Sequence, residues 1–111
     1  MRRALGLTPE AAGLAIAGMS RGGGHAIRHL EGVLIPSGGS LASRVETFKS
    51  IAMPILQNPI HTASWRVGAT ETTAYVGRAQ GNAVVIAVTK EGKVLTSFVP
   101  DSAQLRIMMA R

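Results

Sequence analysis

Two histidines and an arginine follow a run of three glycines near the start of the chain, at residues 22–29 (GGGHAIRH). Histidine gives and takes protons near neutral pH, and the planar guanidinium of arginine offers paired donors to phosphate oxygens. Proton-transfer groups beside an anion-binding group are what cleavage of a phosphodiester needs. The segment therefore predicts phosphodiester chemistry, with His25 and His29 on one helical face and Arg28 as a phosphate ligand. The alternative is a glycine-rich loop that enters a helix whose histidines have no function.

The net charge of the chain indicates which class of partner it binds. The 111 residues suffice for one domain, and 12 Lys and Arg against 6 Asp and Glu give a net charge of +6. The basic residues are spread from Arg2 to Arg111 instead of forming a tail. A small basic domain typically binds a polyanion, which is either a nucleic acid or an acidic protein. One Trp, one Tyr and two Phe argue against a stacking surface for several single-stranded bases.

The residue types exclude several classes of site. The chain has no cysteine, so disulfides, cysteine-bound zinc and thiol catalysis are excluded. No metal-ligand cluster, acidic pair or nucleotide-binding loop is recognisable, and we expect neither a metal nor a cofactor. Residues 11–19 are apolar but too short to span a bilayer, so we expect no membrane anchor. Arg2 and Arg3 before them leave a signal peptide as an alternative. The start signals at residues 8–10 (TPE) favour a short helix, or the remnant of a linker, over residues 1–21.

The elements that position the histidines divide into a helical half and a strand half. Residues 25–31 have the length of two helical turns. Apolar residues recur at helical spacing over residues 41–57, behind Ser40 as an N-cap, which predicts an amphipathic helix. Pro54 is expected to kink that helix or end it early.

The second half is rich in β-branched and aromatic residues, which predicts strands. The turn Glu91-Gly92 predicts an antiparallel hairpin. Residues 82–89 are apolar on both faces, so this strand should be central and covered on both sides. The predicted strands are 60–67, 71–77, 82–89 and 93–99, followed by a short helix near Leu105. The fold class is therefore α+β, with N-terminal helices packed on a C-terminal antiparallel sheet of about four strands.

Four short motifs occur in an order that resembles a known family. They are Gly-Gly-His with a following Arg-His pair, residues 43–48 (SRVETF), residues 58–60 (NPI) with Trp65, and residues 94–100 (VLTSFVP). The chain resembles the C-terminal toxin domains of contact-dependent growth inhibition proteins, in the branch with an RNase A-like fold. The barnase, colicin and RelE-like toxin ribonucleases are the near alternative, because they also join N-terminal helices to an antiparallel sheet. The resemblance makes residues 22–111 the ribonuclease toxin domain.

The chain departs from the pattern of this family at two places. The first histidine is one residue closer to the Arg-His pair than expected. Phe98 stands where a tyrosine is common, and Val99 is an additional residue before the proline. If the tyrosine hydroxyl takes part in the chemistry of the family, this chain does without it.

The resemblance implies a metal-independent endoribonuclease. A general base takes the proton of the RNA 2′-hydroxyl, the oxygen attacks phosphorus, and an acid protonates the leaving 5′-oxygen. The substrate would be tRNA or RNA in general. The domain would be delivered as the C-terminus of a secreted effector, act in the cytoplasm of the target cell, and be blocked by a cognate, acidic immunity protein.

The resemblance also extends the set of predicted site residues. The expected catalytic residues are His25, His29, Arg44 and Thr96, and the expected substrate-binding residues are Arg28, Arg66 and Phe98. Several have a simpler alternative: a solvated helix face for Arg28 and Arg44 or a surface pair of Arg44 with Glu46, strand propensity for Thr96, and core packing for Phe98. His61 opens a strand and is expected to be structural. Two other function classes stay open, a non-catalytic basic module that binds nucleic acid or an acidic protein, and a structural module of a phage or secretion particle.

Overall fold

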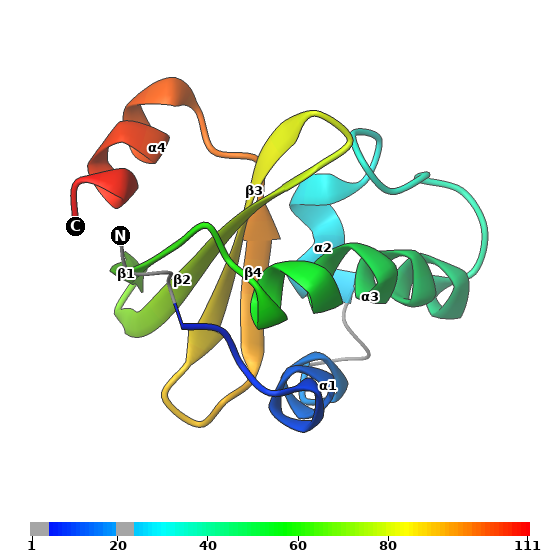
Figure 1. The fold of residues 1–111 in the computed structure, drawn as a ribbon. Helices are drawn as coiled ribbons and strands as arrows, with labels where there is room; N and C mark the ends of the chain where they lie inside the picture. Colours follow the sequence, from blue (N-terminus) through cyan, green and yellow to red (C-terminus); the bar gives the residue numbers. More distant parts are fainter. Residues whose placement is uncertain (1–4, 20–23) are drawn as a thin grey trace.

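A computed structural model describes residues 5–19 and 24–111 of the chain, except for the side chain of His25. It shows a four-stranded antiparallel sheet in the order β1-β2-β3-β4, with α1, α2 and α3 on one side and α4 on the other (Figure 1). The predicted α+β class is confirmed. The elements are α1 (Pro9–Ala17), α2 (Gly24–Ile27), the 3-10 helix η2 (Arg28–Leu30), α3 (Leu41–Gln57), β1 (His61–Val67), β2 (Thr70–Ala79), β3 (Asn82–Thr89), β4 (Val94–Phe98) and α4 (Ser102–Met109).

The helix starts lie where the capping residues predict them. The Thr8 hydroxyl accepts a hydrogen bond from the amide of Ala11, and Ser40 does the same for Ser43, both at 3.1 Å. The expectation that Pro54 would kink or end the helix early is wrong in one respect, because α3 continues to Gln57. Burial of the side chains that follow, Ile55 and Leu56, compensates for the hydrogen bond that a proline cannot donate.

The sheet follows the predicted strands to within a few residues, and β3 matches its prediction at both ends. The β3–β4 hairpin is antiparallel and turns at Gly92, whose φ of +83° suits a residue without a side chain. All side chains from Val84 to Val88 are buried. The prediction that this strand is central and covered on both faces is therefore confirmed.

The main core lies between the sheet and α1, α2 and α3. Phe48, Ile27 and Leu30 are fully buried there against Val84 and Ile86 of β3. Three residues of α1 belong to the same cluster, Ala12, Ala15 and Ile16. The described part of the predicted segment 1–21 therefore packs into the same core as residues 24–111.

The opposite face of the sheet carries a smaller cluster beneath α4. Met108 of α4 is buried against Val76 and Val85, and Trp65 and Phe98 are packed at its margin. The ring of His61 is hydrogen-bonded through Nε2 to the carbonyl of Met108 at 2.9 Å, which fastens α4 to β1. No helix within residues 5–19 and 24–111 is long and apolar enough to cross a membrane.

Candidate active site

A groove of about 540 Å³ lies on the face of the sheet that carries α4. Strands β1 and β4 both line it, although they form the two opposite edges of the sheet. The groove therefore brings residues of the two edge strands together with residues of η2 and α4. Its lining residues are His29, Val33, Trp65, Arg66, Val67, Thr96, Phe98, Val99 and Gln104.

His29 reaches the groove because its neighbours are anchored in the core. Ala26, Ile27 and Leu30 are buried on the side of α2 and η2 that packs against β4, which turns Arg28 and His29 outward. His29 lines the groove, whereas Arg28 is exposed and does not. Of the Arg-His pair, His29 therefore lies in the groove and Arg28 lies outside it.

Strand β4 brings two predicted residues to the groove. Thr96 and Phe98 lie two positions apart and therefore point to the same face. Thr96 is buried at this position. Phe98 packs against the cluster beneath α4 and lines the groove as well, so its predicted contact with substrate and the alternative of core packing are compatible.

Arg66 brings positive charge to the β1 side of the groove. Its Nη2 donates to Glu71 Oε1 at 2.9 Å, and Lys90 Nζ lies 3.8 Å from Glu71 Oε2. The hydrogen bond from Arg66, and then the charges of Arg66 and Lys90, hold the pKa of Glu71 below its usual range. The side chain of Arg66 is still 65% exposed, so its remaining donors are open to solvent.

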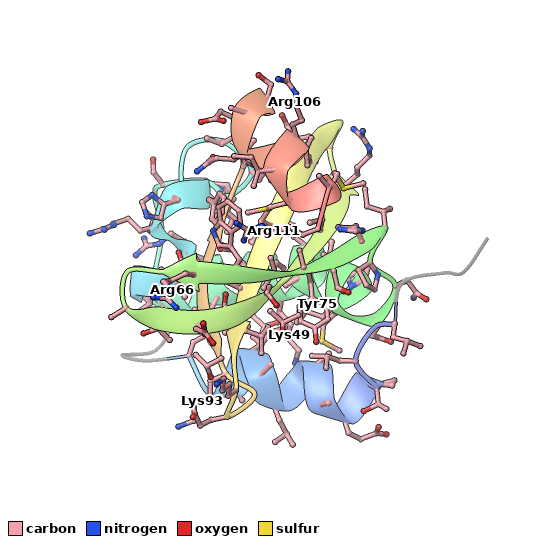
Figure 2. All side chains as sticks on the ribbon, turned by 90° about the vertical axis from the view of Figure 1, so that its left-hand side faces the viewer. Lys49, Arg66, Tyr75, Lys93, Arg106 and Arg111 are labelled. Carbon is pink, nitrogen blue, oxygen red and sulfur yellow. The ribbon has the colours of Figure 1, made fainter. Side chains whose placement is uncertain are left out.

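A second hollow of about 410 Å³ adjoins the groove, because Trp65 and Arg66 line both. Arg111 lies over the Trp65 ring, 5.3 Å from its centroid, and donates to the carbonyl of Ser64 at 2.9 Å. Arg66 and Arg111 are both on the side of the molecule that faces the viewer in Figure 2. Positive charge therefore continues from the groove along β1.

Arg44 does not line the groove. Its Nη1 donates to the carbonyl of Gly39 at 2.9 Å, and its Nε lies 3.8 Å from Glu31 Oε2. The expected surface pair with Glu46 is replaced by this pair with Glu31. Arg44 thus ties α3 to the loop that joins η2 to α3, and its catalytic role stays a prediction.

His25 belongs to α2, one turn before His29, but its side chain lies outside the part of the chain that the structure describes. Its predicted role in proton transfer therefore rests on its position in α2. Within residues 5–19 and 24–111, no three His, Asp or Glu side chains are grouped closely enough to hold a metal ion. His61 is hydrogen-bonded to the backbone of α4, which is a structural contact.

One polar residue of the groove was missed by sequence reasoning, Gln104 at the start of α4. The signal that could have identified it is the pattern Asp101-x-x-Gln104, which is typical of a capping box. This pattern places the glutamine in the first turn of the helix that follows Phe98. It does not reveal that this turn faces the groove, which depends on how α4 packs.

No protein-family model, curated protein or solved structure matches this chain. The resemblance to toxin ribonucleases therefore stays a prediction.

Proposed function

We propose that the protein is a metal-independent endoribonuclease that binds an RNA strand in the groove. One observation carries this proposal: the groove brings together predicted site residues from three separate elements. These are His29 of η2, Arg66 of β1, and Thr96 and Phe98 of β4. A proton-transfer group, a cation, a hydroxyl and an aromatic ring are what binding and cleavage of a ribonucleotide require.

The reaction needs two proton transfers and no external reactant. A base takes the proton of the 2′-hydroxyl, and the 2′-oxygen forms a bond to phosphorus. The bond from phosphorus to the 5′-oxygen breaks, and an acid gives that oxygen a proton, which leaves a 2′,3′-cyclic phosphate. His29 supplies one of these transfers from the groove, and His25, one turn away, supplies the other.

The remaining residues bind the substrate. The Thr96 hydroxyl donates to a non-bridging phosphate oxygen, and the Arg66 guanidinium offsets the charge that develops there. The Phe98 ring contacts the base. Arg28, exposed beside His29, binds a flanking phosphate, and the net charge of +6 draws the polyanion to the protein.

The biological setting in this proposal comes from the sequence resemblance. The protein acts as a toxin domain of a contact-dependent inhibition effector in the cytoplasm of the target cell. It cleaves tRNA or RNA in general, and an acidic immunity protein covers its basic surface. The proposal holds for either of the two toxin ribonuclease folds.

A non-catalytic RNA-binding module is the second candidate, and one observation favours it. No carboxylate within the described chain is hydrogen-bonded to His29, so nothing there orients its ring as acid–base histidines are commonly oriented. A binding module needs the cations and Phe98 but makes no demand on either histidine.

Incubation of the purified protein with an RNA oligonucleotide, with and without EDTA, tests the proposal. We expect cleavage that survives EDTA, disappears on 2′-deoxy substitution, and falls at least a hundredfold in His29→Ala and His25→Ala. His61→Gln is the matched control: His61 lies outside the groove, and the glutamine amide can keep a hydrogen bond to the carbonyl of Met108, so this variant should keep its activity. Intact RNA with tight, salt-sensitive binding would favour the second candidate. Cleavage that needs a divalent metal, or that persists in both histidine variants, would overturn the mechanism.

A further inference from the structure

Gln104 lines the groove and is held in one orientation by a capping box. The amide of Asp101 lies 3.0 Å from Gln104 Oε1, and the amide of Gln104 lies 2.8 Å from Asp101 Oδ1. A backbone amide can only donate, so the Gln104 atom that faces Asp101 has to be the oxygen. The hydrogen bond from Asp101 therefore assigns which end of this side-chain amide is the oxygen and which is the nitrogen.

Because the oxygen of the Gln104 side-chain amide already accepts a hydrogen bond from Asp101, this amide has only its N–H donors left for a ligand. Within the described chain, Gln104 Nε2 has no hydrogen-bond partner, and its two hydrogens are the polar groups that the side chain can offer. Thr96 and the aromatic residues Trp65 and Phe98 also line the groove. A flat ligand with an acceptor atom at its edge matches this arrangement, as a nucleobase does.

We propose that Gln104 Nε2 donates a hydrogen bond to the base held in the groove, at the carbonyl oxygen on C4 of uracil or on C6 of guanine. Uracil and guanine carry such an oxygen, whereas cytosine and adenine carry an amino group at the corresponding position, which would place donor against donor. Gln104 is then a specificity-determining residue that favours uracil and guanine by about tenfold. This inference rests on the proposed function, because it takes RNA as the ligand.

Gln104→Glu tests the proposal with little change to the fold. One carboxylate oxygen can still accept from Asp101, as glutamate does in a capping box, and the other replaces the donor by an acceptor. The substrates are four DNA oligonucleotides, each with one ribonucleotide whose base is uracil, guanine, cytosine or adenine. We expect the wild type to cleave the uracil and guanine substrates about tenfold faster by kcat/KM, and the variant to reverse this preference.

The ratio of kcat/KM between substrates with different bases separates base recognition by Gln104 from a general effect of charge. The added carboxylate repels phosphate and slows cleavage of all four substrates alike, so it does not alter the ratio. The melting temperature of Gln104→Glu should stay at that of the wild type. Cleavage by the wild type with no preference, or with one that Gln104→Glu leaves unchanged, would overturn the role of Gln104 and leave the ribonuclease proposal standing.

If none of the four substrates is cleaved, that result counts against the proposed function alone. A binding measurement then tests the role of Gln104. We expect uridine 3′-monophosphate to bind about tenfold more tightly than cytidine 3′-monophosphate and to shift the NMR signals of the Gln104 side-chain amide. Equal affinity for the two nucleotides, or unchanged amide signals with bound uridine nucleotide, would overturn the proposal.

Discussion

The hydroxyl of Ser97 donates a hydrogen bond to the carbonyl oxygen of Ala26 at 2.8 Å, and both residues are buried. The bond joins β4 to α2 across 71 positions of the sequence. Ser97 lies between Thr96 and Phe98 but points to the opposite face of the sheet. Ala26 adjoins His25 and lies three residues before His29. A single buried contact thus sets the histidine segment against the strand that forms the groove.

Replacement of Ser97 by alanine should lower the free energy of unfolding by about 1–3 kcal/mol, because the buried carbonyl of Ala26 loses its partner. We also expect a lower kcat for RNA cleavage, since α2 and η2 lose their anchor on β4. Urea unfolding and single-turnover cleavage measure the two effects. Ser64→Ala, on an exposed position of β1, serves as the control and should change stability by less than about 0.5 kcal/mol. Equal stability of the two variants would contradict the prediction.

Gly77→Ala should destabilise the fold by about 1–3 kcal/mol through overpacking. A Cβ added at Gly77 would lie 2.6 Å from Cγ1 of Ile55, which is itself buried in the core. Gly13→Ala is the opposite case, because a Cβ there meets nothing within 4 Å and the residue lies inside α1. The higher helix propensity of alanine should raise the free energy of unfolding of this variant by about 0.5–1 kcal/mol. Thermal unfolding of the two variants should therefore shift in opposite directions from the wild type.

The carboxyl of Glu71 should titrate below the usual pH range of glutamate, because the hydrogen bond and charge of Arg66 favour its ionised form. A carboxyl whose pKa is lower in the folded state stabilises the fold above its unfolded pKa. That contribution is lost as the pH falls through the folded pKa. An NMR titration of the Glu71 side chain measures the folded value. In Arg66→Ala the pKa of Glu71 should return toward its usual range, and an unchanged pKa would rule out Arg66 as the main cause.

Glu71→Gln should strengthen RNA binding, because it removes the carboxylate that pairs with Arg66 and lies beside Lys90. For each additional phosphate that the released cations neutralise on a single strand, the slope of log affinity against log salt should steepen by about 0.7. Fluorescence anisotropy with a 2′-deoxy oligonucleotide measures binding without cleavage. Glu46→Gln makes the same change in net charge on an exposed site of α3. The same increase in affinity for both variants would show that net charge, and not release of Arg66, is the cause.

Arg44→Ala decides between the predicted catalytic role of Arg44 and the contacts that the structure shows. Loss of the hydrogen bond to Gly39 and the pair with Glu31 should cost about 1 kcal/mol of stability. The position of Arg44 outside the groove leads us to expect kcat/KM within about threefold of the wild type at a temperature where the variant is folded. A hundredfold loss in kcat/KM would instead restore the catalytic assignment.

Local rules were sufficient to predict most of the elements. Thr8 and Ser40 cap their helices because a side-chain oxygen satisfies an amide that the first helical turn leaves free. Gly92 allows the turn between β3 and β4, and the apolar run in β3 predicts a strand covered on both faces. These features depend on residues close together in the sequence. Pro54 is the exception, because burial of Ile55 and Leu56 outweighs the local preference.

The sequence by itself determined which residue types are present for chemistry and which side chains share a face within one element, such as Thr96 and Phe98 on β4. Only the tertiary structure decided which faces meet. It places His29 and Arg66 in the groove with Thr96, leaves Arg44 with Glu31, and adds Gln104. The physical reason is that backbone geometry sets the periodicity of each element from its own residues. The packing of helices on two sides of the sheet depends instead on contacts between distant segments, such as that of Ser97 with Ala26.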